Sequence, residues 1–174
     1  MFCPHCKLLR IFEARLKKGE QLSEQDKVRY EKCKHHLKLH KHQMGYYMKI
    51  RKEVERDHSK VMIVQDFTRF YVGNKKINDL MICVLVWNAE KDKCEWLYYD
   101  YMEEGIQSKQ DYRFVRKVWR SIFGLENLGN VTPVGTNTTI TISDAIKDKK
   151  IYLFSDGGPG HFKNRYTLAF WAEL

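Results

Sequence analysis

The spacing of apolar residues changes near residue 60, and this change divides the chain into two parts. In the first part, apolar residues recur every three or four positions, which is typical of helices that bury one stripe. Leucine, isoleucine and phenylalanine within residues 7–18 predict one helix, which ends at Gly19. Residues 23–26 (SEQD) resemble a capping box and open a second helix, which continues without proline to about Asp57. The sequence therefore predicts a helical hairpin over residues 1–58.

From residue 61 onward, short apolar runs replace the helical pattern. Residues 61–67 (VMIVQDF) and 80–87 (LMICVLVW) are rich in β-branched and other apolar residues, which indicates buried strands. After the turn NAEKDK, residues 94–101 (CEWLYYDY) return as a third strand. A second capping box at residues 108–111 opens a helix with one apolar face, and Gly124 ends it.

The remaining third of the chain holds one more strand. Residues 127–150 are rich in Thr, Asn and Gly and predict a long loop, with a short strand near residues 139–142. Residues 151–156 (IYLFSD) form the fourth apolar strand, and residues 166–174 are helix-like. The order strand, strand, strand, helix, strand, helix predicts an α/β domain with a mixed sheet over residues 59–174. The fourth strand is expected beside the first, because that position buries it.

The composition of the chain indicates the kind of partner and the cellular compartment of the protein. The chain has 174 residues and a formal charge of +9, from 31 basic and 22 acidic side chains. A basic excess of this size favours a polyanionic partner, most commonly nucleic acid. No apolar run approaches the ~18 residues of a membrane span, and the first residues lack a secretory-signal layout. We therefore expect an intracellular protein without a membrane partner, in which cysteines are thiols or metal ligands. A DNA partner favours the nucleus.

Two carboxylates stand at the predicted carboxyl ends of apolar strands. Asp66 closes the first strand and Asp156 closes the fourth, so neighbouring parallel strands would bring them together at one sheet edge. Adjacent carboxylates repel each other unless a cation lies between them, and hard oxygen ligands suit Mg²⁺ or Mn²⁺. Two such ions can promote phosphoryl transfer. The alternative for Asp156 is an ordinary Asp-Gly turn.

The residues after Asp156 fit a phosphodiester substrate. The glycines of this stretch keep bulky side chains away and would let a nucleic-acid backbone approach. His161 and Lys163 would supply positive charge on the substrate side. The predicted substrate-binding residues are therefore Gly157, Gly158, His161 and Lys163.

These segments resemble a known family. VMIVQDF, KQDYRFVRKVW and FSDGGPGHFKN together resemble the catalytic core of DDE/D-type transposase-like proteins of eukaryotic mobile elements, which share an RNase H-like fold with retroviral-type integrases. The resemblance covers residues 60–174, and FSDGGPGHFK is its most specific part. It implies that Asp66 and Asp156 are catalytic acids and Mg²⁺ ligands. The implied activity is metal-dependent DNA cleavage or strand transfer.

The chain also departs from that family. Such domains continue with a strand and a helix that carries a third acid, whereas Glu173 lies in the helix directly after the second acid. The resemblance thus predicts a C-terminally truncated or degenerate copy, and a non-catalytic nucleic-acid-binding remnant is the alternative function. The missing strand would leave a sheet edge exposed. Self-association is therefore expected through that edge or through the long helix.

The N-terminal hairpin carries a second group of candidate metal ligands. Cys3 and Cys6 form a CxxC pair, and His36 and His40 share a helix face one turn apart. These four residues would bind Zn²⁺ tetrahedrally if the hairpin brings them together. The family resemblance suggests His36 with His42 instead, so the fourth ligand stays open. The alternative is a solvated His- and Lys-rich face with free cysteines, while Cys83 and Cys94 are expected to pack within strands.

Overall fold

The structure is a computed structural model that describes residues 4–104, 112–155, 169 and 171–172. The chain divides into two compact units, Met1–Ile50 and Arg51–Leu174. The division falls inside the long second helix, so the last turns of that helix belong to the second unit.

The first unit is the predicted helical hairpin. It contains α1 (Pro4–Lys17) and most of α2 (Glu24–Arg56). Gly19 adopts a positive φ of 78°, and the amide of Glu20 donates to the carbonyl of Arg15 at 3.1 Å, as in a Schellman helix end. Ser23 caps α2, because its Oγ accepts from the amide of Asp26 at 3.2 Å. Both helix boundaries predicted from these residues are confirmed.

The connection between α1 and α2 is held by one arginine. Arg15 bonds the carboxylates of Glu20 at 2.9 Å and Asp26 at 3.2 Å. Beside it, Leu9 and Phe12 of α1 are buried, at 4% and 2% exposure. The apolar stripe predicted for α1 is thus its packed face.

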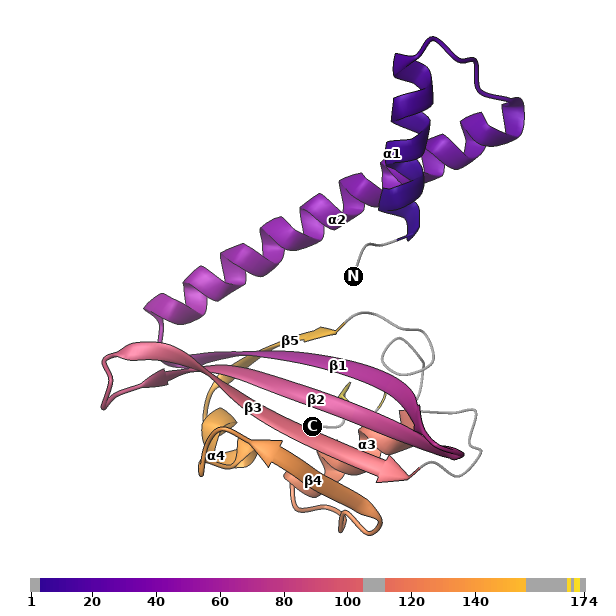
Figure 1. The fold of residues 1–174 in the computed structure, drawn as a ribbon. Helices are drawn as coiled ribbons and strands as arrows, with labels where there is room; N and C mark the ends of the chain where they lie inside the picture. The colour runs from indigo at the N-terminus through magenta and orange to yellow at the C-terminus, as the bar shows by residue number, and fades with distance from the viewer. Residues whose placement is uncertain (1–3, 105–111, 156–168, 170, 173–174) are drawn as a thin grey trace. The chain divides into compact units, whose positions relative to one another are not determined.

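The second unit is built on a five-stranded mixed sheet (Figure 1). The strand order is β4-β3-β2-β1-β5; β1 and β5 are parallel, and the other neighbours are antiparallel. The α/β class and the place of the fourth apolar run beside the first are therefore confirmed. The strands are β1 (Lys60–Val72), β2 (Lys75–Asn88), β3 (Lys93–Glu104), β4 (Val131–Thr136) and β5 (Lys150–Ser155).

The first two strands are longer than the sequence pattern predicted. They form one hairpin, in which Val72 pairs with Lys75 across a two-residue turn. Gly73 supplies the positive φ of 59° that such a turn needs. The apolar runs mark only the buried parts of these strands, because the two strands continue beyond the core as an exposed, polar hairpin.

The region 127–150 was predicted as a loop with a short strand near residues 139–142, and this prediction was wrong in detail. The strand β4 lies earlier and contains Pro133 and Gly135, residues that argue against a central strand. They are tolerated because β4 is an edge strand that pairs only with β3. Thr141 instead caps a short helix, α4 (Ile142–Ile146), by accepting from the amide of Asp144 at 3.1 Å.

One face of the sheet is covered by helices. Figure 1 shows α3 (Tyr112–Ile122) and α4 on the same side, and their apolar residues join one core with alternate residues of β1, β2 and β3. Trp119 of α3 is fully buried at its centre. Its indole donates to Oε1 of Gln65 on β1 at 2.8 Å, and it meets Trp171 edge to face at 4.9 Å. The predicted apolar face of α3 is confirmed, while its predicted cap at residues 108–111 lies outside the described residues.

The last turns of α2 are joined to the sheet by polar contacts. Lys60 of β1 pairs with Glu53 at 2.7 Å and with Asp57 at 2.9 Å. The hydroxyl of Tyr152 on β5 donates to the same Glu53 carboxylate at 2.8 Å. Lys60 and the hydroxyl and amide of Ser59 lower the pKa of Asp57 to about 2. These contacts connect the end of α2 to both β1 and β5.

Candidate functional site

Asp66 lies in the middle of β1, not at its end. The strand continues for six residues to Val72, so the predicted end position is wrong. The pairing with β5 nevertheless stops beside it: Gln65 pairs with Ser155, the last residue of β5. Asp156 follows Ser155 in the sequence and lies outside the described residues. The parallel β1–β5 pair therefore brings the end of β5 next to the residue that precedes Asp66.

Asp66 shares a sheet face with two further acids. Across the sheet, Asp66 is opposite Met81 of β2, and Met81 is opposite Asp100 of β3. Asp79 lies two residues before Met81 on the same strand, so its side chain points to the same face. We call the face that carries Asp66, Asp79 and Asp100 the acidic face; it is opposite the helix-covered face. Part of it is accessible to solvent, because Asp66 is exposed and Met81 is 42% exposed.

The sequence analysis missed Asp79 and Asp100. Asp79 lay just outside the apolar run 80–87, and Asp100 stood among the tyrosines of the third strand. Residue alternation within the two strands could have placed both acids on one face. Their pairing across β2 and β3 could not be inferred, because it depends on the register of the hairpin.

The carboxyl groups of Asp79 and Asp100 interact directly. Burial is the largest of the causes that together raise the pKa of Asp79 to about 7; the others are a hydrogen bond to Asp100 and the charges of Asp100 and Asp66. One oxygen of each acid is buried without a hydrogen-bond partner among the described residues. Burial also raises the pKa of Cys83 on this face, with smaller contributions from Asp100 and Asp66. The acidic face thus holds a proton between two carboxyl groups near neutral pH.

Replacing Asp79 with asparagine should stabilise the protein at pH 8. The folded-state pKa of Asp79 lies above its ordinary value of 3.8, so the folded protein binds the proton more tightly than the unfolded chain. The wild-type protein therefore loses stability as pH rises from about 4 to 7. Asparagine keeps a donor toward Asp100 and carries no charge. We expect a gain of about 1–2 kcal/mol at pH 8, discounted because the site is only half-buried, and almost none at pH 4.

This gain can be measured by urea unfolding of both proteins at the two pH values. Asp148→Asn is the control, since Asp148 is an exposed turn residue. An equal gain in the control, or a gain that does not depend on pH, would contradict the proposed carboxyl pair.

The other predicted substrate and acid residues cannot be placed. Gly157, Gly158, His161 and Lys163 lie outside the described residues, as does Glu173. The tyrosines of β3 alternate between faces: Tyr98 is 45% exposed, whereas Tyr99 is buried and donates its hydroxyl to the carbonyl of Ile140 at 2.7 Å. The alternation of a strand accounts for these tyrosines.

Three histidines of the first unit, His5, His36 and His40, lie side by side. The ring of His36 stacks on His5 of α1 at 4.9 Å and lies 6.5 Å from the ring of His40. His5, which lies inside the CPHC motif, was not among the predicted ligands. Cys33 is buried, and Cys6 is half-buried.

These residues do not by themselves complete the predicted zinc site. Within residues 4–104, 112–155, 169 and 171–172, no group of three or more His, Cys, Asp or Glu side chains could hold a metal ion. Cys3 lies outside this part of the chain. The set Cys3, Cys6, His36 and His40 remains a prediction, and so does its alternative with His42.

Two general findings complete the description. No helix in the described part of the chain has both the length and the apolar character needed to cross a membrane. No protein-family model, curated protein or solved structure matches the chain. The structure defines a class: a five-stranded α/β domain in which β1 to β4 pair antiparallel and β5 joins β1 in parallel, with an acidic face, preceded in sequence by a helical hairpin.

Proposed function

We propose that the second unit is a domain for metal-dependent cleavage or strand transfer of DNA, of the DDE/D transposase type with an RNase H-like fold. The observation that carries the proposal is the parallel pairing of β1 with β5, which stops at Gln65 and Ser155. Asp66 follows Gln65 in β1, and Asp156 follows Ser155 in the sequence. This pattern supports two acids close together where the β1–β5 pairing ends, at the carboxyl end of β5, the kind of position where α/β sheets bind ligands.

The chemistry of the donors suits Mg²⁺ or Mn²⁺. Asp66 offers a solvent-exposed carboxylate on an open sheet face, and hard cations prefer such oxygen ligands. Asp66 and Asp156 would hold the ion; when bound, it would supply Lewis-acid stabilisation of phosphoryl transfer. Asp79 and Asp100, which share a proton near neutral pH, together add about one negative charge nearby, and this charge favours cations at this face.

A second candidate function is DNA binding without cleavage, and α2 favours it. Most basic side chains of this helix are exposed. Some are paired with acids one turn away, as Lys27 is with Glu24 at 2.6 Å. Six others form no ion pair among the described residues and leave positive charge on the helix surface for phosphates. Four of these six lie in the first unit: Lys32, Lys38, Lys41 and Lys49.

The two functions separate in one experiment on the complete chain. The protein is incubated with supercoiled plasmid and Mn²⁺, with and without EDTA, and nicked product is measured beside DNA binding. Nicking that EDTA abolishes would support the cleaving domain. Binding without nicking would overturn that proposal and leave the second function. The absence of both would overturn both.

DNA binding is expected to depend on salt through the lysines of α2. Replacing Lys32, Lys38, Lys41 and Lys49 together with glutamine should reduce the slope of log K against log salt by about 3–4, since each phosphate contact contributes about 0.9. Fluorescence anisotropy with a labelled duplex over a range of KCl concentrations measures this slope. Lys93→Gln, at an exposed position in the second unit, is the control. An unchanged slope in the fourfold variant would exclude α2 as the DNA-binding surface.

A further inference from the structure

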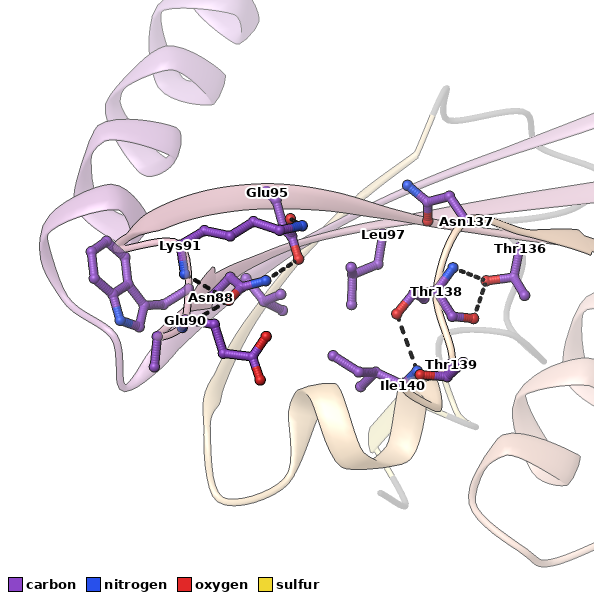
Figure 2. A pocket seen from close by; sticks show the side chains of 13 residues that line it. Asn88, Glu90, Lys91, Glu95, Leu97, Thr136, Asn137, Thr138, Thr139 and Ile140 are labelled. Carbon is purple, nitrogen blue, oxygen red and sulfur yellow. Dashed lines mark hydrogen bonds and ion pairs between the residues drawn. The ribbon is translucent and has the colours of Figure 1, made fainter.

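A cleft of about 850 Å³ opens at the end of the sheet where the β2–β3 turn lies (Figure 2). One wall is the turn itself, from Asn88 to Lys91, with Glu95 of β3. The other wall is the segment 136–140, which connects β4 to α4. Val86 and Leu97 lie between the walls. The size is typical of pockets that bind small molecules.

The cleft is separate from the candidate catalytic site. Its floor residues Val86 and Leu97 belong to the core on the helix-covered face, whereas Asp66 points to the acidic face. In the register of β1 and β2, Asp66 is opposite Met81, five residues along the strand from Val86. A ligand in the cleft would therefore not contact Asp66.

The threonine-rich wall is held in place by its own hydrogen bonds. The side chain of Asn137 accepts from the amide of Tyr98 at 2.8 Å and donates to the carbonyl of Trp96 at 3.0 Å, so it pairs with the edge of β3 as a strand would. The amide of Ile140 donates to Oγ1 of Thr138 at 3.1 Å, and Tyr99 holds the carbonyl of Ile140. The wall is thus formed before any ligand arrives, which lowers the cost of binding.

The opposite wall carries a net negative charge. Glu95 pairs with Lys91 at 2.6 Å and accepts a hydrogen bond from Asn88 at 2.5 Å. These two contacts lower the pKa of Glu95, so it is ionised and its negative charge compensates the positive charge of Lys91. Glu90 has no ion pair or side-chain hydrogen bond among the described residues. Figure 2 shows its carboxylate pointing from the turn toward Ile140. One uncompensated carboxylate therefore faces the cleft in a chain whose net charge is positive.

We propose that this cleft binds a small organic cation, with an apolar body against Ile140 and an amine or amidine group against Glu90. Ile140, which is 43% exposed, offers apolar surface that a bound ligand would bury. The hydroxyls and backbone carbonyls of the Thr136–Ile140 wall offer acceptors for the remaining N–H groups of the cation. The carboxylate of Glu90 distinguishes a cation from a neutral molecule of the same shape. This inference does not depend on the proposed DNA cleavage.

Benzamidine tests the proposal, with benzamide as its neutral counterpart of nearly the same shape. Both are titrated into the ¹⁵N-labelled complete chain, and amide shifts are followed. We expect benzamidine to bind with a Kd of about 1 mM, given its few non-hydrogen atoms, and to shift amides of residues 88–91 and 136–140. Benzamide should bind at least about threefold more weakly.

Two variants and a control complete the test. Glu90→Gln should weaken benzamidine about threefold to fivefold, as expected for a solvent-exposed ion pair, and leave benzamide unchanged. Thr139→Trp should fill the cleft and abolish the shifts. Asp92→Asn, in the same turn but outside the cleft lining, should bind as the wild type does. Equal binding of the two compounds, shifts elsewhere only, or equal weakening by Glu90→Gln and Asp92→Asn would each overturn the proposal.

Discussion

Replacing Asp66 with asparagine is expected to lower the rate of Mn²⁺-dependent DNA nicking by about 100-fold or more. The substitution keeps the size of the side chain and removes the charge that would hold a divalent cation. Lewis-acid stabilisation contributes several kcal/mol to such transition states, and each 1.36 kcal/mol changes the rate tenfold. The measurement is the initial rate of conversion of supercoiled to nicked plasmid at saturating DNA. The same loss is expected for Asp156→Asn.

Asp66 is exposed, so its loss should not unfold the protein. Circular dichroism and urea unfolding of the variant should therefore match the wild type. Asp92→Asn controls for the removal of one surface acid, since Asp92 is exposed in the β2–β3 turn. If Asp66→Asn and Asp156→Asn both nick DNA at the wild-type rate, these residues are not catalytic. If only Asp79→Asn or Asp100→Asn removes the activity, the functional acids are elsewhere on the acidic face.

Replacing Trp119 with alanine should lower the free energy of unfolding by about 3–5 kcal/mol. Trp119 is fully buried and contacts both Phe123 and Trp171, so its truncation leaves a large cavity. The amide of Gln65, which is 2% exposed, would also lose its hydrogen-bond partner. Urea denaturation followed by circular dichroism gives this difference. A loss below about 1.5 kcal/mol would show that the core relaxes around the missing side chain.

A second variant isolates the hydrogen bond from the packing. Trp119→Phe keeps most of the apolar surface but cannot donate to Gln65, and we expect a loss of about 1–3 kcal/mol. In a Gln65→Leu background the same change should cost less, because no buried amide is then left unpaired. Equal costs in the two backgrounds would mean that the 2.8 Å contact contributes nothing. Ile122→Val on α3, at a half-buried position, controls for a small loss of apolar volume.

The bond between Trp119 and Gln65 connects the core to the candidate site. Gln65 precedes Asp66 on β1, and it also pairs with Ser155 at the end of β5. Successive side chains of a strand point to opposite faces, so Gln65 enters the helix-covered core while Asp66 faces solvent. Anchoring Gln65 to α3 therefore fixes the backbone from which Asp66 projects. Nicking by Trp119→Phe should consequently fall even where the protein remains folded.

Local sequence patterns determined the positions of the helices and the order of the strands along the chain. Gly19 and Ser23 set the ends of α1 and α2 through hydrogen bonds that span only a few residues. Gly124 ends α3 in the same way, with a positive φ of 70°. The apolar runs of β1, β2, β3 and β5 were recognisable because a buried strand needs little beyond its own composition. For the same reason the position of β5 beside β1 could be predicted, because burying both apolar strands required it; the parallel direction of the pair comes from the structure.

Only the tertiary structure decided what depends on register and on neighbours distant in sequence. Asp66 became a mid-strand residue because the Gly73 turn extends β1 past its apolar part and pairs it with β2. The register of β2 and β3 brought Asp79 and Asp100 together, and burial then raised the pKa of Asp79. The segment that forms β4 contains Pro133, so its local composition argues against a strand. It is nevertheless a strand because it pairs with the edge of β3. Local patterns determine which segments become helix or strand, whereas strand pairing, which joins residues far apart in the chain, determines which side chains meet.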